Sequence, residues 1–212
     1  MLEKIGTPGH EVISTPDATV RRLLVDCLAM TPDPVYYEVG VGIGATAVKV
    51  ARTLANRGKM FLFSREHEVR ELKADLEALG FTNVNGDWAS PRNTFSGYHF
   101  ELAYGFLSGE LPPFDLAYLD GGHVFHLDAP AACVLKELCK PGGHIVFDDW
   151  SWSLERSVGL NPKTRPATAV EYDPRQIREC HVPMVCRTIM DTDPRFRFLG
   201  LESDSAIYRR VG

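Results

Sequence analysis

Short apolar runs alternate with helical patterns through the middle of the chain. Between them, residues 45–54, 68–79 and 125–139 place apolar side chains at helical spacing. Strands alternating with helices build βαβ units, which form a parallel, doubly wound sheet. In such sheets, ligands bind at the carboxyl ends of the strands. The runs that predict strands are 35–39, 59–64, 82–85, 114–119 and 144–147.

The two ends of the chain follow other patterns. Residues 1–33 form a segment whose helix we expect to begin with Thr15 as a cap and Pro16 at the first helical position. Residues 34–149 form the predicted cofactor-binding core. Residues 150–194 form the predicted substrate or lid region. Within it, residues 150–173 are rich in Pro, Ser, Trp and Arg, which favours a lid or substrate loop, and a helix is expected at 182–190. Residues 195–212 alternate as a hairpin, so the chain is expected to be one α/β domain.

The composition narrows the classes of function. Lys and Arg total 23 against 28 Asp and Glu, a net charge of −5, and the cations are scattered. A nucleic-acid partner is therefore not expected, and a small-molecule substrate is. The 5 cysteines show no framework of disulfides. Without a signal-like or membrane-length apolar run, we expect a cytoplasmic protein with no membrane partner, whose oligomeric state, a homodimer included, stays open.

A glycine-rich loop follows the first predicted strand. It has glycines at every second position, Gly40, Gly42 and Gly44, after Glu38. The spacing is wrong for the G-x-G-x-x-G of dinucleotide-binding proteins. It resembles the E/D-x-G-x-G-x-G motif of class I S-adenosylmethionine-dependent methyltransferases, in which the bare backbone lies against the amino-acid half of the cofactor. Tight packing of a βα turn is the alternative explanation for the glycines.

The resemblance also implies where the rest of the cofactor binds. The family places a ribose-binding acid at the end of the second strand, but this chain has Ser64 there. Glu66 is the predicted substitute, and Glu68 is expected to serve as a charge at the start of a helix. Gly86-Asp87 resembles the acidic loop with which the family binds around the adenine, and Trp88 is available to stack on the base. A solvated charge at Glu66 and a simple turn at Asp87 are the alternatives.

Three aspartates follow two later strands. Asp120 lies in D-G-G-H, and Asp148 and Asp149 end the segment P-G-G-H-I-V-F-D-D-W. These segments resemble those of metal-dependent O-methyltransferases, which include enzymes that methylate sugars of macrolide and aminocoumarin antibiotics. The resemblance implies that the aspartates bind Mg²⁺, a cation that prefers carboxylate ligands, and that Asp120 also serves the cofactor and catalysis. Two alternatives to a metal site remain. A D-G-x-H segment also occurs in related methyltransferases without an established metal, and one aspartate of the consecutive pair could cap the next helix.

Methyl transfer to oxygen requires removal of the acceptor's proton. His123, three residues after Asp120, is the preferred general base; an orienting role for it is the alternative. His126 is expected at the start of the next helix, and His144 as a buried strand residue. Two aromatic and two cationic side chains are expected either to line an acceptor pocket or to serve packing and solvation. They are Trp150, Trp152, Arg156 and Arg165.

These observations predict a Rossmann-like, seven-stranded, mostly parallel sheet with a C-terminal antiparallel hairpin. The expected function is S-adenosylmethionine-dependent methylation of a small-molecule hydroxyl with Mg²⁺ assistance. Two alternatives remain: a non-catalytic S-adenosylmethionine-binding module on this fold, and an NAD-dependent oxidoreductase, which the glycine spacing disfavours.

Overall fold

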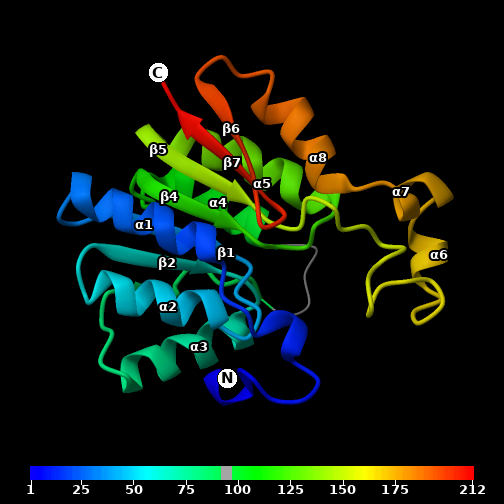
Figure 1. Cartoon of the computed structure of the whole chain (residues 1–212), viewed down its shortest axis with the longest axis horizontal. Coiled ribbons are helices and arrows are strands. Elements are labelled where there is room, and N and C mark those ends of the chain that lie inside the picture. Colours follow the sequence, from blue (N-terminus) through cyan, green and yellow to red (C-terminus); the bar gives the residue numbers. More distant parts are fainter. Residues whose placement is uncertain (92–96) are drawn as a thin grey trace.

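The computed structural model describes residues 1–91 and 97–212. Its centre is a seven-stranded sheet in the order β3-β2-β1-β4-β5-β7-β6 (Figure 1). Strands β1 to β5 run parallel, and β7 and β6 add an antiparallel hairpin beside β5. This confirms the predicted fold class. The strands are β1 (Val35–Val39), β2 (Lys59–Phe63), β3 (Val84–Asn85), β4 (Phe114–Leu119), β5 (Cys139–Phe147), β6 (Phe196–Glu202) and β7 (Ser205–Arg210).

Helices cover both faces of the sheet, which explains why the inner strands are apolar throughout. One face packs against α1, α2 and α3, and the other against α4, α5 and α8. Alternate residues of one strand divide between the layers: Tyr36 belongs to the first core and Tyr37 to the second. The α-helices are α1 (Ala18–Met30), α2 (Ala45–Leu54), α3 (Glu66–Ala78), α4 (Tyr98–Ser108), α5 (Phe125–Leu138), α6 (Thr168–Glu171), α7 (Pro174–Arg178) and α8 (His181–Val185).

Three local predictions need correction. The cap of α1 is Asp17, whose side chain accepts from the Val20 N–H at 2.6 Å, so the helix begins later than Thr15 suggested. The expected turn at residues 141–143 is part of β5, with a register shift against β4. The predicted helix at 182–190 begins at His181 and changes after α8 to a wider turn, Cys186–Met190. The polar stretch expected at 88–98 lies partly outside the described residues.

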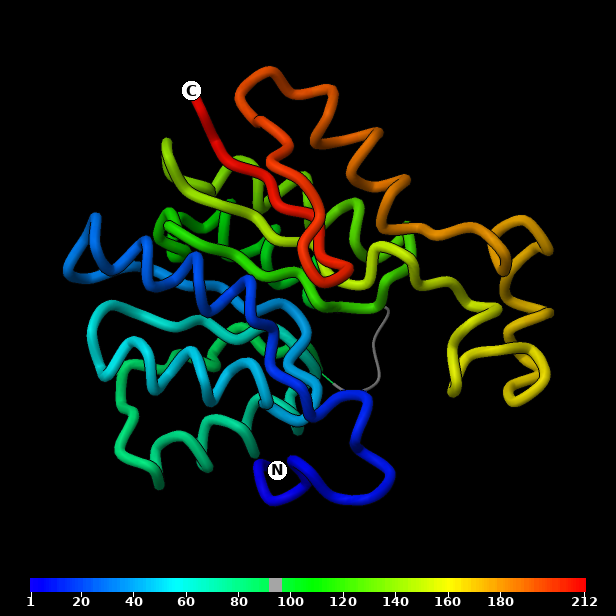
Figure 2. The backbone as a smooth tube through the Cα atoms, viewed as in Figure 1, coloured from blue at the N-terminus to red at the C-terminus, as the bar shows by residue number. Residues whose placement is uncertain are grey.

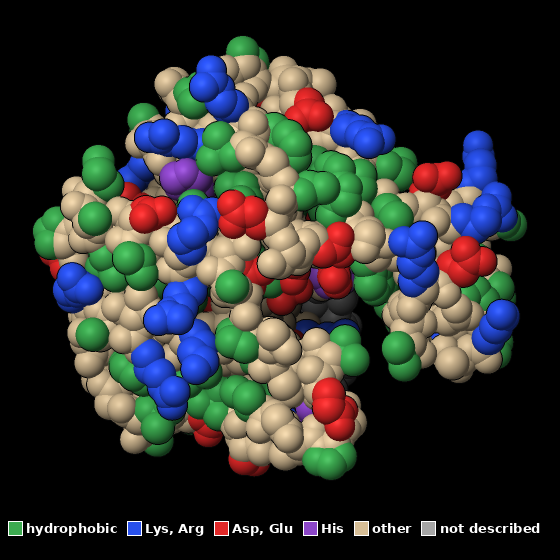
Figure 3. Space-filling model, viewed as in Figure 1, with side chains coloured by type: hydrophobic (Ala, Val, Ile, Leu, Met, Phe, Trp, Pro, Cys, Tyr) green, Lys and Arg blue, Asp and Glu red, His purple; other side chains and the backbone are tan. Residues whose placement is uncertain are grey.

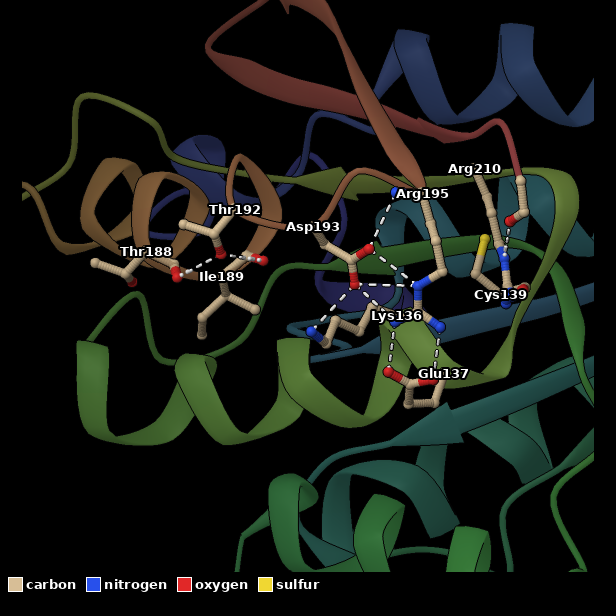
Figure 4. Close-up of polar contacts among 10 residues, drawn as sticks. Lys136, Glu137, Cys139, Thr188, Ile189, Thr192, Asp193, Arg195 and Arg210 are labelled. Atoms are coloured by element: carbon tan, nitrogen blue, oxygen red, sulfur yellow. Dashed lines mark hydrogen bonds and ion pairs between the residues drawn. The ribbon is translucent and has the colours of Figure 1, made fainter.

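An ion-pair network fastens the hairpin to α5 (Figure 4). Arg195, just before β6, binds Asp193 at 2.6 Å and Glu137 of α5 at 2.6 Å. Lys136, also on α5, lies 3.2 Å from Asp193. The hydrogen bonds from Arg195 hold the pKa of the buried Asp193 carboxyl below its usual value. The network thereby holds the start of the edge strand β6 against α5, which packs on one face of the sheet.

Residues 155–178, which include α6 and α7, extend away from the sheet (Figures 1 and 2). This segment, hereafter the arm, corresponds to the region predicted as a lid or substrate loop. All 5 cysteines are free. Among the described helices, none has the length and apolar character needed to cross a membrane.

A cavity at the carboxyl ends of the strands

A cavity of about 920 Å³ opens at the carboxyl ends of the parallel strands. The loops after β1, β2, β4 and β5 all contribute to its wall, because parallel strands end at the same edge of the sheet. Val12, Ile13 and Thr15 of the N-terminal segment close part of one side. Figure 3 shows the surface hollowed between the arm and the main body, with acidic side chains at its edge.

The three glycines of the loop after β1 have different constraints. A Cβ on Gly40 would lie 1.8 Å from the Asp120 carbonyl oxygen, and one on Gly44 would lie 2.4 Å from the Leu72 side chain. These two glycines are therefore explained by tight packing. Gly42, with φ +49°, has no atom within 4 Å of such a Cβ. Because Gly42 lines the cavity, its missing side chain leaves room for a ligand.

Glu38, the last but one residue of β1, is a buried carboxyl at the cavity wall. It is 1% exposed and accepts a hydrogen bond from the Tyr36 hydroxyl at 2.9 Å. Burial raises the pKa of Glu38 to about 8. The group therefore keeps its proton at neutral pH unless a cation comes near.

The end of β2 presents a different glutamate from the predicted one. The Ser64 hydroxyl donates to Glu68 at 2.6 Å, and both residues line the cavity. Glu66 is exposed, absent from the cavity wall and 4.0 Å from Arg70. Two positions along a helix turn a side chain by about 200°, so the two glutamates face opposite ways. The four-residue spacing of Ser64 and Glu68 was the available signal.

Asp87 and Trp88 are not part of the cavity wall. Asp87 closes a local turn, accepting from the Asn85 side-chain amide at 2.8 Å. Trp88 packs on the core, with its ring centroid 6.5 Å from that of Tyr104. The turn explanation therefore accounts for the contacts of Asp87, and cofactor binding by either residue stays a prediction.

The three predicted aspartates all line the cavity. Burial and the nearby Asp148 and Asp149 raise the pKa of Asp120 well above its usual value. Asp148 accepts hydrogen bonds from the Tyr118 hydroxyl and, at 2.6 Å, from the Ser205 hydroxyl. Burial raises the pKa of Asp149 to about 6, with Asp148 adding to the effect. The wall is therefore a cluster of carboxyls that disfavours further negative charge.

His123 lies between two of these carboxyls. Its Nε2 is 3.6 Å from Asp120 Oδ1 and 3.3 Å from Asp149 Oδ2. The side chain is 14% exposed, and burial lowers its pKa, which favours the neutral imidazole. The Nδ1 atom is buried and has no hydrogen-bond partner among the described residues. Trp152 packs beside the ring, with centroids 5.4 Å apart.

The other predicted side chains lie outside the cavity wall. His126 contacts Tyr172 of the arm, with ring centroids 5.9 Å apart, and His144 is half-buried within β5. Trp150 stacks on Phe198, with centroids 6.3 Å apart. The two arginines are engaged elsewhere. Arg156 donates to the Ser151 carbonyl, and Arg165 pairs with Glu171.

The aspartates do not form the predicted magnesium site in this arrangement. Across residues 1–91 and 97–212, no three His, Cys, Asp or Glu side chains converge closely enough to hold a metal ion. Both oxygens of Asp148 already accept hydroxyl groups, and His123 Nε2 stands between the other two carboxyls. The side chains as placed do not fit Mg²⁺, so no catalytic step is derived through a metal.

Comparison with known proteins identifies the family. Residues 37–150, more than half of the chain, match the family described as methyltransferase domain. The chain belongs to this family. The matched residues include the glycine loop and all three aspartates, so most of the cavity wall lies within the matched part of the methyltransferase. No curated protein matches the sequence.

Solved structures share the fold of this methyltransferase at low identity. The O-methyltransferase TomG from Streptomyces achromogenes, in complex with S-adenosylmethionine, has a TM-score of 0.63 at 17% identity over 100% of this chain and 89% of its own. The O-methyltransferase from Bacillus cereus, in complex with S-adenosylhomocysteine, has the same TM-score and identity over 100% and 90%. The Podospora anserina methyltransferase PaMTH1, bound to S-adenosylhomocysteine, gives 0.62 and 15% over 99% and 85%. The chain thus shares the Rossmann-like fold of these methyltransferases.

Proposed function

We propose that this methyltransferase transfers the methyl group of S-adenosylmethionine to a hydroxyl oxygen of a small molecule. One observation carries the proposal: a single cavity of about 920 Å³ joins the open backbone at Gly42, the carboxylate of Glu68 and the imidazole of His123. These groups match the three needs of the reaction, which are a place for the cofactor's amino-acid half, a partner for its ribose and a base.

The cofactor contacts follow from this arrangement. The bare Gly42 backbone accommodates the methionine moiety, and Glu68 accepts hydrogen bonds from the ribose hydroxyls in place of an acid at position 64. Glu38 and Asp120 supply carboxyl groups near the cationic part of the cofactor. Since a cation favours ionised carboxylates, cofactor binding should release protons from these buried groups.

The chemistry uses His123 as general base. The acceptor oxygen attacks the methyl carbon in line with the bond to sulfur; the new O–C bond forms as the C–S bond breaks, and the sulfur keeps the electron pair. The hydroxyl proton passes to the neutral imidazole of His123. The adjacent carboxyl of Asp149, 3.3 Å from Nε2, stabilises the imidazolium that results.

The acceptor is proposed to be a small neutral or cationic hydroxyl compound. A wall of carboxyls disfavours phosphates, and the net charge of −5 gives no overall attraction for nucleic acid. The similar structures titled O-methyltransferases agree with oxygen as the acceptor atom. Homodimer formation stays a prediction, and a Mg²⁺ requirement would need the carboxyls to rearrange from their present positions.

Calorimetric titration with S-adenosylhomocysteine, with and without Mg²⁺, tests the cofactor. Glu68→Gln should weaken binding by about tenfold through loss of charge-assisted hydrogen bonds. The matched variant Glu66→Gln, on the same helical turn, should bind as the wild type does. Equal effects of the two variants would contradict the ribose assignment, and stabilisation by NAD(H) alone would point to the oxidoreductase.

Transfer of a radiolabelled methyl group to a panel of catechols, sugars and phenolic polyketides tests the activity. Labelled methyl ether should appear with at least one hydroxyl acceptor and disappear in His123→Ala. Tight cofactor binding with no transfer to any acceptor would instead support a non-catalytic binding module.

A further inference from the structure

A hydrogen-bonded pair, the partly buried Tyr98 and the buried Asp128, lies against the loop that carries His123. Asp128, in the first turn of α5, is 2% exposed, and the Tyr98 hydroxyl of α4 donates to its Oδ1. The Tyr98 oxygen in turn accepts from the Gly122 N–H at 2.9 Å. The backbone N–H groups of Gly122 and His123 also face the Asp128 carboxylate. The two side chains therefore bind the backbone of the loop at residues 120–123.

The loop is shaped to this pair. A Cβ on Gly121 would lie 2.5 Å from the Tyr98 hydroxyl oxygen, and one on Gly122 would lie 2.8 Å from the Leu127 side chain. The D-G-G-H sequence thus has glycines where α4 and α5 press against the backbone. This packing accounts for both glycines, which also line the cavity.

His123 itself needs outside support. Its φ is +52°, in the left-handed region that a residue with a side chain adopts only when its surroundings impose it. The ring cannot be oriented through Nδ1, which has no partner among the described residues. The backbone held by Tyr98 and Asp128 is what places Nε2 between Asp120 and Asp149.

We infer that Tyr98 and Asp128 are positioning residues for methyl transfer, holding the 120–123 loop so that the His123 imidazole meets the acceptor hydroxyl. This rests on the proposed function. Tyr98 also lines the cavity, so its ring borders the ligands while its hydroxyl faces the loop.

The test compares two Tyr→Phe variants. Tyr98→Phe removes the hydroxyl and keeps the ring. Tyr208→Phe is the control, because the Tyr208 hydroxyl also donates to a carboxylate, Asp191 Oδ1 at 2.7 Å, and neither residue belongs to the cavity wall. Both variants lose one hydroxyl–carboxylate bond. Tyr98→Phe also loses the bond from the Gly122 N–H and leaves the buried Asp128 without its hydroxyl donor, whereas Asp191 is exposed, so we expect the larger fall in thermal midpoint in Tyr98→Phe.

Kinetics with an accepted hydroxyl substrate should separate them. Misplacement of a catalytic group by about 1 Å costs up to about 100-fold, so Tyr98→Phe should lower kcat by about 10- to 100-fold and change KM for S-adenosylmethionine by less than about threefold. Tyr208→Phe should leave both constants unchanged. Unchanged kcat in Tyr98→Phe, or equal losses in both variants, would overturn the inference.

Hydrogen exchange gives a second measurement that needs no acceptor. In Tyr98→Phe, the amides of residues 121–124 should exchange at least about tenfold faster than in the wild type, whereas Tyr208→Phe should leave them protected. If these amides exchange faster in Tyr98→Phe but the wild type transfers methyl to no acceptor, the proposed function is refuted and the loop-holding role of Tyr98 stands. Unchanged exchange would refute the positioning role whatever the activity.

Discussion

Replacing Gly40 by alanine tests how the glycine loop is built. The added Cβ would lie 1.8 Å from the Asp120 carbonyl oxygen and 2.9 Å from the Gly121 Cα, so backbone must move. The residue also has φ +87°. A left-handed conformation costs an alanine about 1–2 kcal/mol, and overpacking about 1–3 kcal/mol more. We expect Gly40→Ala to lower the free energy of unfolding by about 2–5 kcal/mol.

Urea unfolding followed by circular dichroism measures this change, and Gly42→Ala is its matched control. Gly42 also has positive φ but open space around it, so its stability cost should be about 1 kcal/mol. Its Cβ would instead enter the cavity and weaken S-adenosylhomocysteine binding. Equal stability losses in the two variants, or a Gly40→Ala loss below about 1 kcal/mol, would refute the packing argument.

The remaining predictions concern pH, the hairpin and metal removal. In the folded protein the pKa of Glu38 is about 8, which is above its value in the unfolded chain. The stability that the protonated carboxyl contributes is therefore fully present below the unfolded-state pKa and is lost as the pH rises through the folded-state pKa. The unfolding free energy of the wild type relative to Glu38→Gln should fall by about 3 kcal/mol between about pH 5 and 8; parallel urea-unfolding curves would contradict the burial argument. Arg195→Ala leaves the Asp193 carboxylate with Lys136 and the backbone N–H of residue 195, and should cost about 1–3 kcal/mol. Arg197→Ala, exposed on the same hairpin, should cost less than about 0.5 kcal/mol; equal costs would argue against the network. Because the aspartates as placed do not fit a metal ion, treatment with EDTA should leave methyl transfer and S-adenosylhomocysteine binding unchanged. Loss of activity that added Mg²⁺ restores would show that the aspartates rearrange around a cation.

Local patterns predicted the strands well because each run is short, apolar and bounded by turn residues. Element ends were less accurate. Thr15 and Asp17 both carry oxygens that can cap a helix. A tertiary contact accompanies the choice of Asp17, because its backbone N–H donates to the Thr46 hydroxyl of α2. Residues 141–143 have the composition of a turn but lie within β5, where they belong to the irregularity between the pairs Phe114–Cys139 and Leu116–His144.

The sequence by itself determined the order of strands and helices, the glycine loop after β1, and the acidic residues at the ends of β4 and β5. Those features depend on neighbours along the chain. The tertiary structure decided that Glu68 rather than Glu66 faces the cavity, and that Asp148 is engaged by hydroxyls from Tyr118 and Ser205.

The tertiary structure also brought Tyr98 and Asp128 together behind the His123 loop, 30 residues apart in the chain. Such contacts depend on how α4 and α5 pack on the sheet, and periodicity along one helix does not specify which residues of another it meets. Burial acts in the same way, since the proton affinity of Glu38 is set by the layers packed around it. The sequence determines which residue types are available at the cavity, whereas packing determines where their side chains point, which groups they bind and whether they are charged.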